Sequence, residues 1–315
     1  MEIVDILIDD NGDENNNDPK NSEIVLNELT IEDDEISETK ISSEAVKRLL
    51  GAVSFGYGLF QVSLSFMPPN ALKLIKIFGF EGDRSIALKA ISFTSKSKDM
   101  RAPFADMVLL WYSTIATPLL GVSAVDIRIS DEDTKQIIEK NLTKYPKSSL
   151  FYYFKGKFCR TSLHDLKASL ENYEIASENS KHIREIQFIS IYEIGWLYLQ
   201  NLDFEKSLEY FHILSKESKW SRSFNGYISA VVAGSSGKFD EANAYAKEAI
   251  KIISSQKRKK NPIEVFALKR LEYFKKNPIK TKNLCELLSV EMLFLWVCFP
   301  YCDEDKLNKM LESNF

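Results

Sequence analysis

A spacing of small residues in the second half of the sequence limits the possible folds of this chain more than any other feature. Gly195 and Ser207 stand among large apolar residues at helical spacing, and Asp203-Phe204-Glu205 lies between them. The large residues are Ile191, Ile194, Tyr198, Phe211 and Leu214. Small side chains allow two helices to approach closely, and large ones fill the space between neighbouring helix pairs. The segment therefore predicts two antiparallel helices joined at Asp203.

Two further segments repeat this pattern less completely. In the preceding segment, Gly156 and Ala168 take the small positions, but Asn172 falls where a large residue is expected and Tyr173 lies one position late. In the following segment the equivalent residues are Ala230, Ala242, Ala246 and Ala249. Helix pairs with a period of about 34 residues are typical of tetratricopeptide repeats. We expect three such repeats over 145–255 in an all-α, right-handed solenoid, with a plain array of helical hairpins as the alternative.

The region 43–144 contains start and stop signals for several helices. The hydroxyl groups of Ser42-Ser43 suit a helix start, and Pro68-Pro69 ends that helix. Gly82 suits a left-handed cap, Asp83 suits the next helix start, and Pro118 is expected to kink its helix. We expect helices at 43–66, 71–80, 84–97, 102–122 and 131–144.

The uncharged stretch 49–68 is about long enough to span a bilayer. It also contains Gly51, Gly56 and Gly58, together with four polar residues. Small residues suit close packing between helices, so we favour a helix buried in protein over a membrane span.

The two ends of the chain differ in charge. Residues 1–40 contain 14 Asp or Glu and two Lys, so 1–42 is predicted to be a disordered acidic arm. It either shields a basic face or is a solvated tail. In the C-terminal segment 256–315, Lys257–Lys260 is a nuclear import signal, a phospholipid contact or a solvated linker. Helices are expected at 261–275, 280–300 and 304–313, with the apolar stretch 287–301 packed against the last repeat.

Several stretches together resemble the tetratricopeptide repeat protein thirty-nine family, which includes the fungal inclusion body clearance proteins. They are Gly51–Pro69, Ile77–Arg84, Leu150–Lys157, Leu214–Ser221 and Glu291–Trp296. The resemblance covers 45–315 and implies a non-catalytic protein of the cytoplasm or nucleus. It also implies links to inclusion-body clearance, lipid droplets and lipid metabolism. Family members are longer at both ends, so the chain resembles a short member or a part of one.

Residue patterns of catalytic and metal sites are missing from the sequence. The three histidines stand apart, and Cys298 and Cys302 are four positions apart, whereas a zinc site needs four ligands. We therefore predict buried thiols in a reduced intracellular protein, and no metal, cofactor, catalytic residue or small-molecule substrate. No phosphate-binding, nucleophile-elbow or nucleic-acid motif is present, so neither an enzyme nor a nucleic-acid partner is expected.

The first helices of a tetratricopeptide solenoid line its concave face, which binds partners in such proteins. The register places Leu150, Tyr153, Lys157, Ile189, Tyr192, Trp196, Phe224 and Tyr227 on this face, followed by Arg160, Leu199, Val231 and Gly234. Tyrosine recurs at the same register position in all three repeats, at 153, 192 and 227. Such a surface suits an apolar helix or an extended peptide, and it lacks the Lys/Asn cluster that clamps a terminal carboxylate. The alternative is that flanking helices of the chain fill the groove.

The sequence thus predicts a scaffold that binds other proteins through this groove, in the cytoplasm and also in the nucleus. The alternative function is a peripheral lipid-droplet or membrane protein that uses 49–68 or 257–260 as its contact.

Overall fold

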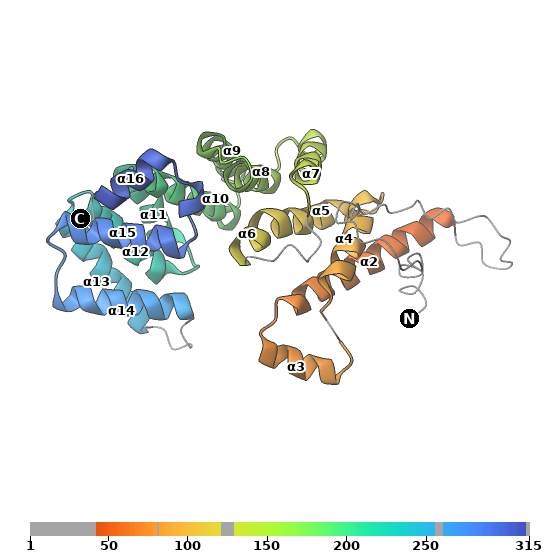
Figure 1. The fold of residues 1–315 in the computed structure, drawn as a ribbon, viewed down its shortest axis with the longest axis horizontal. Helices are drawn as coiled ribbons and strands as arrows, with labels where there is room; N and C mark the ends of the chain where they lie inside the picture. Colours follow the sequence, from red (N-terminus) through yellow and green to blue (C-terminus); the bar gives the residue numbers. More distant parts are fainter. Residues whose placement is uncertain (1–41, 81, 121–128, 256–260, 313–315) are drawn as a thin grey trace. The chain divides into compact units, whose positions relative to one another are not determined.

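The computed structural model describes residues 42–80, 82–120, 129–255 and 261–312. All regular secondary structure within these ranges is helical, which confirms the predicted all-α class (Figure 1). Apart from Ser42, the acidic arm 1–42 lies outside the described residues, as does the basic run 257–260. The chain divides into two compact units, the first containing α2 to α4 and the second containing nearly all of α5 and every later helix.

The first unit consists of α2 (Ser43–Ser65), α3 (Pro69–Ile77) and α4 (Arg84–Lys96). As expected, Ser42 and Asp83 are N-caps, and their side chains accept hydrogen bonds from the backbone N–H groups of Ala45 and Ile86. The left-handed residue in the connection is Gly79 (φ 80°), so the prediction for Gly82 is wrong. Gly82 is required for another reason, because a Cβ there would lie 2.6 Å from the backbone nitrogen of Ser65.

Helix α2 packs against α4 through its small residues. A Cβ at Gly58 would lie 2.8 Å from Ile91, and Thr94 Oγ1 donates a hydrogen bond to the carbonyl oxygen of Gly51 over 3.0 Å. Gly51 and Gly58 therefore serve helix packing, as the sequence indicated for the small residues of 49–68, whereas Gly56 has nothing within 4 Å of its Cβ position. Only one face of α2 is buried, and Leu49 and Val53 lie on its exposed face.

Across the described parts of the chain, every helix is too short or too polar to cross a membrane.

The second unit begins with α5 (Ala102–Trp111), a π-helical turn (Tyr112–Ala116), α6 (Thr117–Leu120) and α7 (Asp131–Lys144). The expected helix 102–122 is interrupted because Pro118 supplies no N–H, and the backbone widens into the π turn just before it. Helices α5 and α7 are joined by the buried Asp106 carboxylate, which accepts a hydrogen bond from Asn141 Nδ2 over 2.7 Å. The sequence predicts that these helices belong to the N-terminal region 43–144. In the structure they belong to the same compact unit as the repeats.

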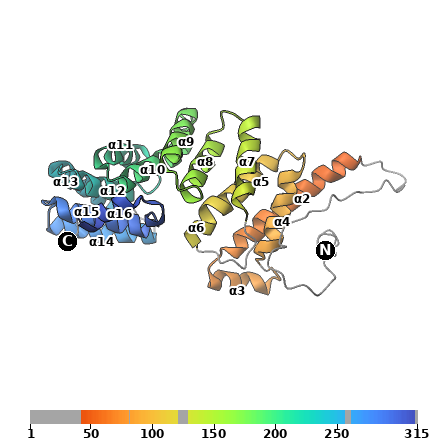
Figure 2. The same cartoon turned by 45° about the horizontal axis from the view of Figure 1, so that its top comes forward.

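Three successive helical hairpins follow, and neighbouring helices pack against each other (Figure 2). They are α8 (Ser149–Thr161) with α9 (Leu166–Asn179), α10 (Arg184–Gln200) with α11 (Phe204–Glu217), and α12 (Arg222–Ser235) with α13 (Phe239–Ser255). The chain continues with α14 (Pro262–Lys276), α15 (Lys282–Leu295), a 3₁₀ turn (Phe299–Tyr301) and α16 (Glu304–Glu312). This succession of hairpins is the predicted solenoid.

In each of the first two hairpins, a serine of the second helix donates a hydrogen bond to a glycine carbonyl oxygen of the first helix. Ser169 Oγ donates to the carbonyl oxygen of Gly156 over 2.8 Å, and Ser207 Oγ donates to that of Gly195 over 2.9 Å. Ser169, not Ala168, is therefore the equivalent of Ser207, and the first hairpin has one more residue between its paired positions. This extra residue brings Tyr173 into the place that Phe211 takes in the second hairpin.

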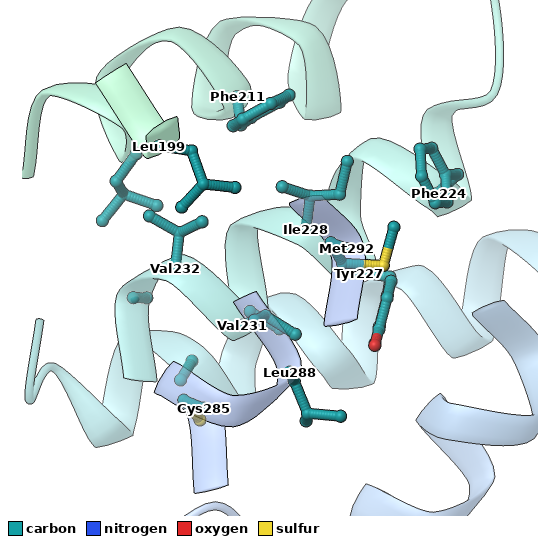
Figure 3. Close-up of a cluster of buried hydrophobic side chains, with 14 of the residues drawn as sticks. Leu199, Phe211, Phe224, Tyr227, Ile228, Val231, Val232, Cys285, Leu288 and Met292 are labelled. Atoms are coloured by element: carbon teal, nitrogen blue, oxygen red, sulfur yellow. The ribbon is translucent and has the colours of Figure 1, made fainter. Parts of the chain in front are cut away.

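Helix α12 lies in the centre of the second unit, with every residue from Ser223 to Ser235 buried. Helices α11, α13, α14 and α15 all contact it. Figure 3 shows the α15 side chains of Cys285, Leu288 and Met292 beside Ile228 and Val231 of α12. The apolar C-terminal stretch thus packs against the third hairpin, as predicted.

A divided groove as candidate binding site

The predicted groove residues lie on α8, α10 and α12, but the structure exposes them to different degrees. Trp196, Phe224 and Tyr227 are buried, at 1%, 2% and 0% exposure. Of the residues that follow in the register, Arg160, Leu199, Val231 and Gly234 are also buried. The other predicted residues, Leu150, Tyr153, Lys157, Ile189 and Tyr192, are partly buried. C-terminal segments of the chain cover Trp196, Phe224 and Tyr227, so at these positions the structure corresponds to the alternative in which the chain fills its own groove.

Trp296 covers two of these residues. It follows the last turn of α15 and stacks on Trp196, with ring centroids 5.3 Å apart, and on Phe224, with centroids 4.8 Å apart. Its Nε1 donates a hydrogen bond to the hydroxyl oxygen of Tyr192 over 2.7 Å. Burial raises the pKa of Tyr192, so this hydroxyl stays protonated at neutral pH.

The backbone immediately after Trp296 is strained. Val297 has φ 53°, in the left-handed region that a β-branched residue rarely adopts. Such a conformation costs about 1–3 kcal/mol and persists only where the surrounding packing fixes it. The stacking of Trp296 on Trp196 and Phe224 is packing of this kind.

Trp296 lies between two cavities and lines both of them, together with Tyr192, Glu193 and Ile263. The larger cavity has a volume of about 550 Å³ and is lined by Lys157 and Arg160 among apolar residues. We call it the charged cavity. The smaller has a volume of about 330 Å³ and is called the apolar groove. The groove predicted as one continuous surface is therefore divided.

In the charged cavity, two cations share one carboxylate. Lys157 Nζ lies 2.7 Å from Glu193 Oε1, and Arg160 Nη1 lies 3.1 Å from Glu193 Oε2. Arg160 Nη2 also lies 3.5 Å from Cys298 Sγ, and its guanidinium lies 5.5 Å from the centre of the Tyr301 ring. Burial lowers the pKa of Lys157, and the adjacent Glu193 opposes that shift.

Four of the predicted residues meet in the apolar groove, namely Tyr153, Ile189, Tyr192 and Phe224. Trp220 adds an indole ring that is 72% exposed. The charged pair Glu185 and Lys219 also lines the groove, with 3.8 Å between the carboxylate oxygen and the ammonium nitrogen. The result is an aromatic and aliphatic surface with charges of both signs.

The remaining predicted residues lie elsewhere. Trp196 and Lys157 line the charged cavity, whereas Leu150 and Tyr227 line neither cavity. Tyr227 packs against Phe266 and Phe274 of α14, with ring centroids 5.9 Å and 6.4 Å apart. It is therefore part of the core.

The prediction from the sequence did not include Glu193 or Trp296. Glu193 is the only charged residue between Ile186 and Asp203, on a helix that is otherwise largely apolar. A single charge in such a segment was a usable signal, because an unpaired charge is costly to bury. Trp296 had no comparable signal.

The four cysteines are unpaired thiols, three buried and Cys302 partly buried, as predicted. Residues 42–80, 82–120, 129–255 and 261–312 contain no group of three or more potential metal ligands.

No solved structure matches the chain. A family model described as Iml2/Tetratricopeptide repeat protein 39 matches residues 13–314. The match includes the three hairpins, both cavities and the C-terminal helices that cover the groove. The chain therefore belongs to the Iml2/tetratricopeptide repeat protein 39 family.

Proposed function

We propose that this protein is a non-enzymatic scaffold whose apolar groove binds an apolar segment of a partner protein. The family indicates a tetratricopeptide-like repeat protein that acts through protein–protein interaction. The observation that favours this groove is Trp220, whose indole ring is 72% exposed beside a cavity of about 330 Å³. Exposed aromatic rings next to a pocket are typical of residues that dominate the energy of protein interfaces.

The groove suits a helix or an extended peptide with one or two large apolar side chains. Phe188, Ile189 and Leu214 supply aromatic and aliphatic surface, and the hydroxyl oxygen of Tyr192 accepts its hydrogen bond from within the fold. Glu185 and Lys219 offer one charge of each sign for orienting a bound segment. Affinity would come from burial of apolar surface, and the charges would contribute to specificity.

The partners in this proposal are client or quality-control proteins, and the resemblance to inclusion body clearance proteins supports that choice. We further propose that this scaffold acts in the cytoplasm, and also in the nucleus, in lipid-linked protein quality control.

The test uses the full chain as bait for cell extract, with quantification of the captured proteins by mass spectrometry. Trp220→Ala should reduce capture of the specific partners at least tenfold, because it removes the exposed anchor. Tyr273→Ala is the matched control, since Tyr273 is a 52% exposed aromatic residue on α14 that lines neither cavity. Equal capture by both variants, with unchanged circular dichroism, would contradict the proposal.

One observation favours a second function, that of a peripheral membrane or lipid-droplet protein. Helix α3 contains no buried residue, and Leu74, Ile77 and Phe78 are exposed beside Lys73 and Lys76. Short amphipathic segments with lysines bind anionic lipid surfaces. The contact would then include α3 next to the stretch 49–68.

Flotation with anionic vesicles tests this second function. The double variant Ile77→Asp with Phe78→Asp should leave the protein in the bottom fraction, whereas Leu163→Asp, at an exposed apolar position of the second unit, should not alter flotation. If the unsubstituted chain does not float with the vesicles, the membrane function is wrong.

A further inference from the structure

We propose that the charged cavity is a binding site for a ligand that has one carboxylate group attached to an apolar chain. This goes beyond the proposed scaffold function and rests on other residues. Lys157, Arg160 and Leu295 line the charged cavity and not the apolar groove.

The charges that line the cavity do not balance. Lys157 and Arg160 supply two positive charges, and Glu193 supplies one negative charge. The side chains of Lys157, Arg160 and Glu193 are 14%, 8% and 8% exposed, so water compensates the surplus cation poorly. A buried surplus charge is unfavourable unless an ion of opposite sign accompanies it. One bound monoanion would neutralise the surplus positive charge.

The Lys157 ammonium group has more hydrogen-bond donors than it has hydrogen-bond partners among the described residues. A lysine ammonium group has three N–H donors. Among the described residues, the hydrogen-bond partner of the Lys157 ammonium group is Glu193 Oε1, at 2.7 Å. Two donors therefore have no hydrogen-bond partner among the described residues, although the ammonium nitrogen also lies 5.8 Å from the centre of the Tyr153 ring. A carboxylate accepts such donors through charge-assisted hydrogen bonds, which are stronger than neutral ones.

The walls of the charged cavity suit the apolar part of an organic ligand. Beyond the charged residues, the lining comes from several helices and is mostly apolar. It includes Ile115, Pro118, Leu119, Phe266, Leu295 and Val297. Its volume of about 550 Å³ lies within the range of about 300–1,000 Å³ that is common for organic ligands. A small inorganic anion would leave these walls uncovered, whereas an alkyl chain would bury them.

The single surplus charge also selects among anions. A carboxylate carries one negative charge and matches the charge of the site, whereas a phosphate monoester carries nearly two at neutral pH. The site is therefore expected to prefer an alkyl carboxylate to an alkyl phosphate.

Such a carboxylate has two sources, a free long-chain acid or the C-terminus of an apolar peptide. The chemistry at Lys157 is the same for both. The two differ in the apolar group that is attached to the carboxylate, so the experiment includes one arm for each.

The experiment is a calorimetric titration of the full chain with decanoate and with decanamide, which has the same chain and no charge. Decanoate should bind at least tenfold more tightly. Equal affinity for the two, or no binding of decanoate, would overturn the proposal. This comparison needs no variant, so it does not depend on whether a substituted chain folds.

Variants test the role of the charges. Lys157→Met should weaken decanoate binding about tenfold, and Lys157→Arg should retain it. Glu193→Gln should tighten it severalfold, because the surplus charge rises from one to two. Lys206→Met is the control, since Lys206 is an exposed lysine that lines neither cavity. Unchanged affinity in a folded Lys157→Met variant would show that this lysine does not bind the carboxylate.

Competition identifies the source. An apolar peptide with a free C-terminus and the same peptide with an amidated C-terminus are each added to the decanoate complex. If only the peptide with the free C-terminus displaces decanoate, the site is assigned to a peptide C-terminus. If neither peptide displaces decanoate, the site is assigned to a free long-chain acid. Displacement by both peptides alike would overturn the proposal, because the carboxylate would then be dispensable. Trp220→Ala, which tests the scaffold function, should leave decanoate binding unchanged, so the two proposals fail separately.

Discussion

The indole ring of Trp296 lies nearly parallel to that of Trp196, with centroids 5.3 Å apart and an angle of 16° between the planes. Trp196 belongs to the first helix of the second hairpin, and Trp296 directly follows helix α15 in the C-terminal segment. The pair therefore joins the C-terminal segment to the inner surface of the repeats. It also buries a residue that the repeat register places on the binding face.

Replacing Trp296 tests the energy of this contact. Trp296→Ala should lower the free energy of unfolding by about 3–5 kcal/mol, because it removes two ring stacks and leaves a cavity. Urea denaturation followed by circular dichroism measures this change. Trp220→Ala is the comparison, and it should change the free energy by less than about 0.5 kcal/mol because the ring is exposed. Similar losses in both variants would contradict the assigned packing.

Glycine substitutions test the close approach of helices within a hairpin. A Cβ at Gly156 would lie 2.7 Å from the Tyr173 ring, so Gly156→Ala should destabilise the fold by about 1–3 kcal/mol. Gly56 has nothing within 4 Å of such a Cβ, and Gly56→Ala should stabilise α2 by about 0.5–1 kcal/mol. Thermal unfolding distinguishes the two substitutions by the sign of their effect. A stabilising Gly156→Ala would contradict the tight packing.

The shared carboxylate of Glu193 should be necessary for stability. Glu193→Ala leaves Lys157 and Arg160 buried without their anion, and the expected loss is about 3–5 kcal/mol. Adding Lys157→Met to this variant should restore part of the loss, because it removes one of the two uncompensated cations. A double-mutant cycle at neutral pH measures this coupling. Strictly additive effects would show that the two side chains do not interact.

Stability should fall under mildly alkaline conditions. Burial raises the pKa of the Cys285 thiol to about 12 and that of Cys298 to about 11, from an ordinary value of 9.0. Above about pH 9 the unfolded chain releases these protons while the folded chain keeps them, so the unfolded state gains stability as the pH rises. The effect is absent below that pH, where both states are protonated.

Urea midpoints between pH 8 and pH 11 measure this dependence. The double variant Cys285→Ala with Cys298→Ala should have a shallower decline between pH 9 and pH 10. Buried tyrosines, including Tyr227, should contribute only at higher pH, because their ordinary pKa is 10.0. A midpoint that does not depend on pH would argue against burial of the thiols.

Helix boundaries were predictable wherever a capping residue stood beside a periodic segment. Ser130 accepts a hydrogen bond from the backbone N–H of Asp133, and α7 extends over Asp131–Lys144, as the sequence indicated. The cap and the helix are local features, so their physics is contained in a few neighbouring residues.

The register of the first hairpin was not predictable in the same way. Its turn, 162–165, has one residue more than the turn of the second hairpin, 201–203. Both turns contain a left-handed residue that is not glycine, His164 at φ 52° and Leu202 at φ 58°, so no glycine in the sequence indicates the length of either turn. The second hairpin has the usual repeat spacing, whereas the additional residue of the first has no signal in the helical periodicity. The repeat pattern therefore places Ala168 where the structure has Ser169.

The covering of the groove could not be inferred from periodicity. The apolar stretch 287–301 indicated that these residues are buried, but a helical pattern identifies the buried face and not its neighbour. The position of Trp296 against Trp196 depends on the path of the chain through α13 and α14. Exposure on the concave face was therefore the least predictable property of the candidate site.

The enclosure of α12 has a consequence for how this protein opens. In an extended repeat array, terminal hairpins detach one at a time, and their amide protons exchange with solvent accordingly. Four helices contact α12, and all its residues from Ser223 to Ser235 are buried. Its amides should therefore exchange only when the surrounding helices separate together, and these residues should be the slowest-exchanging region of the chain. For the same reason, gain or loss of a hairpin at this end would disturb the whole cluster, and the number of repeats there should change rarely in evolution.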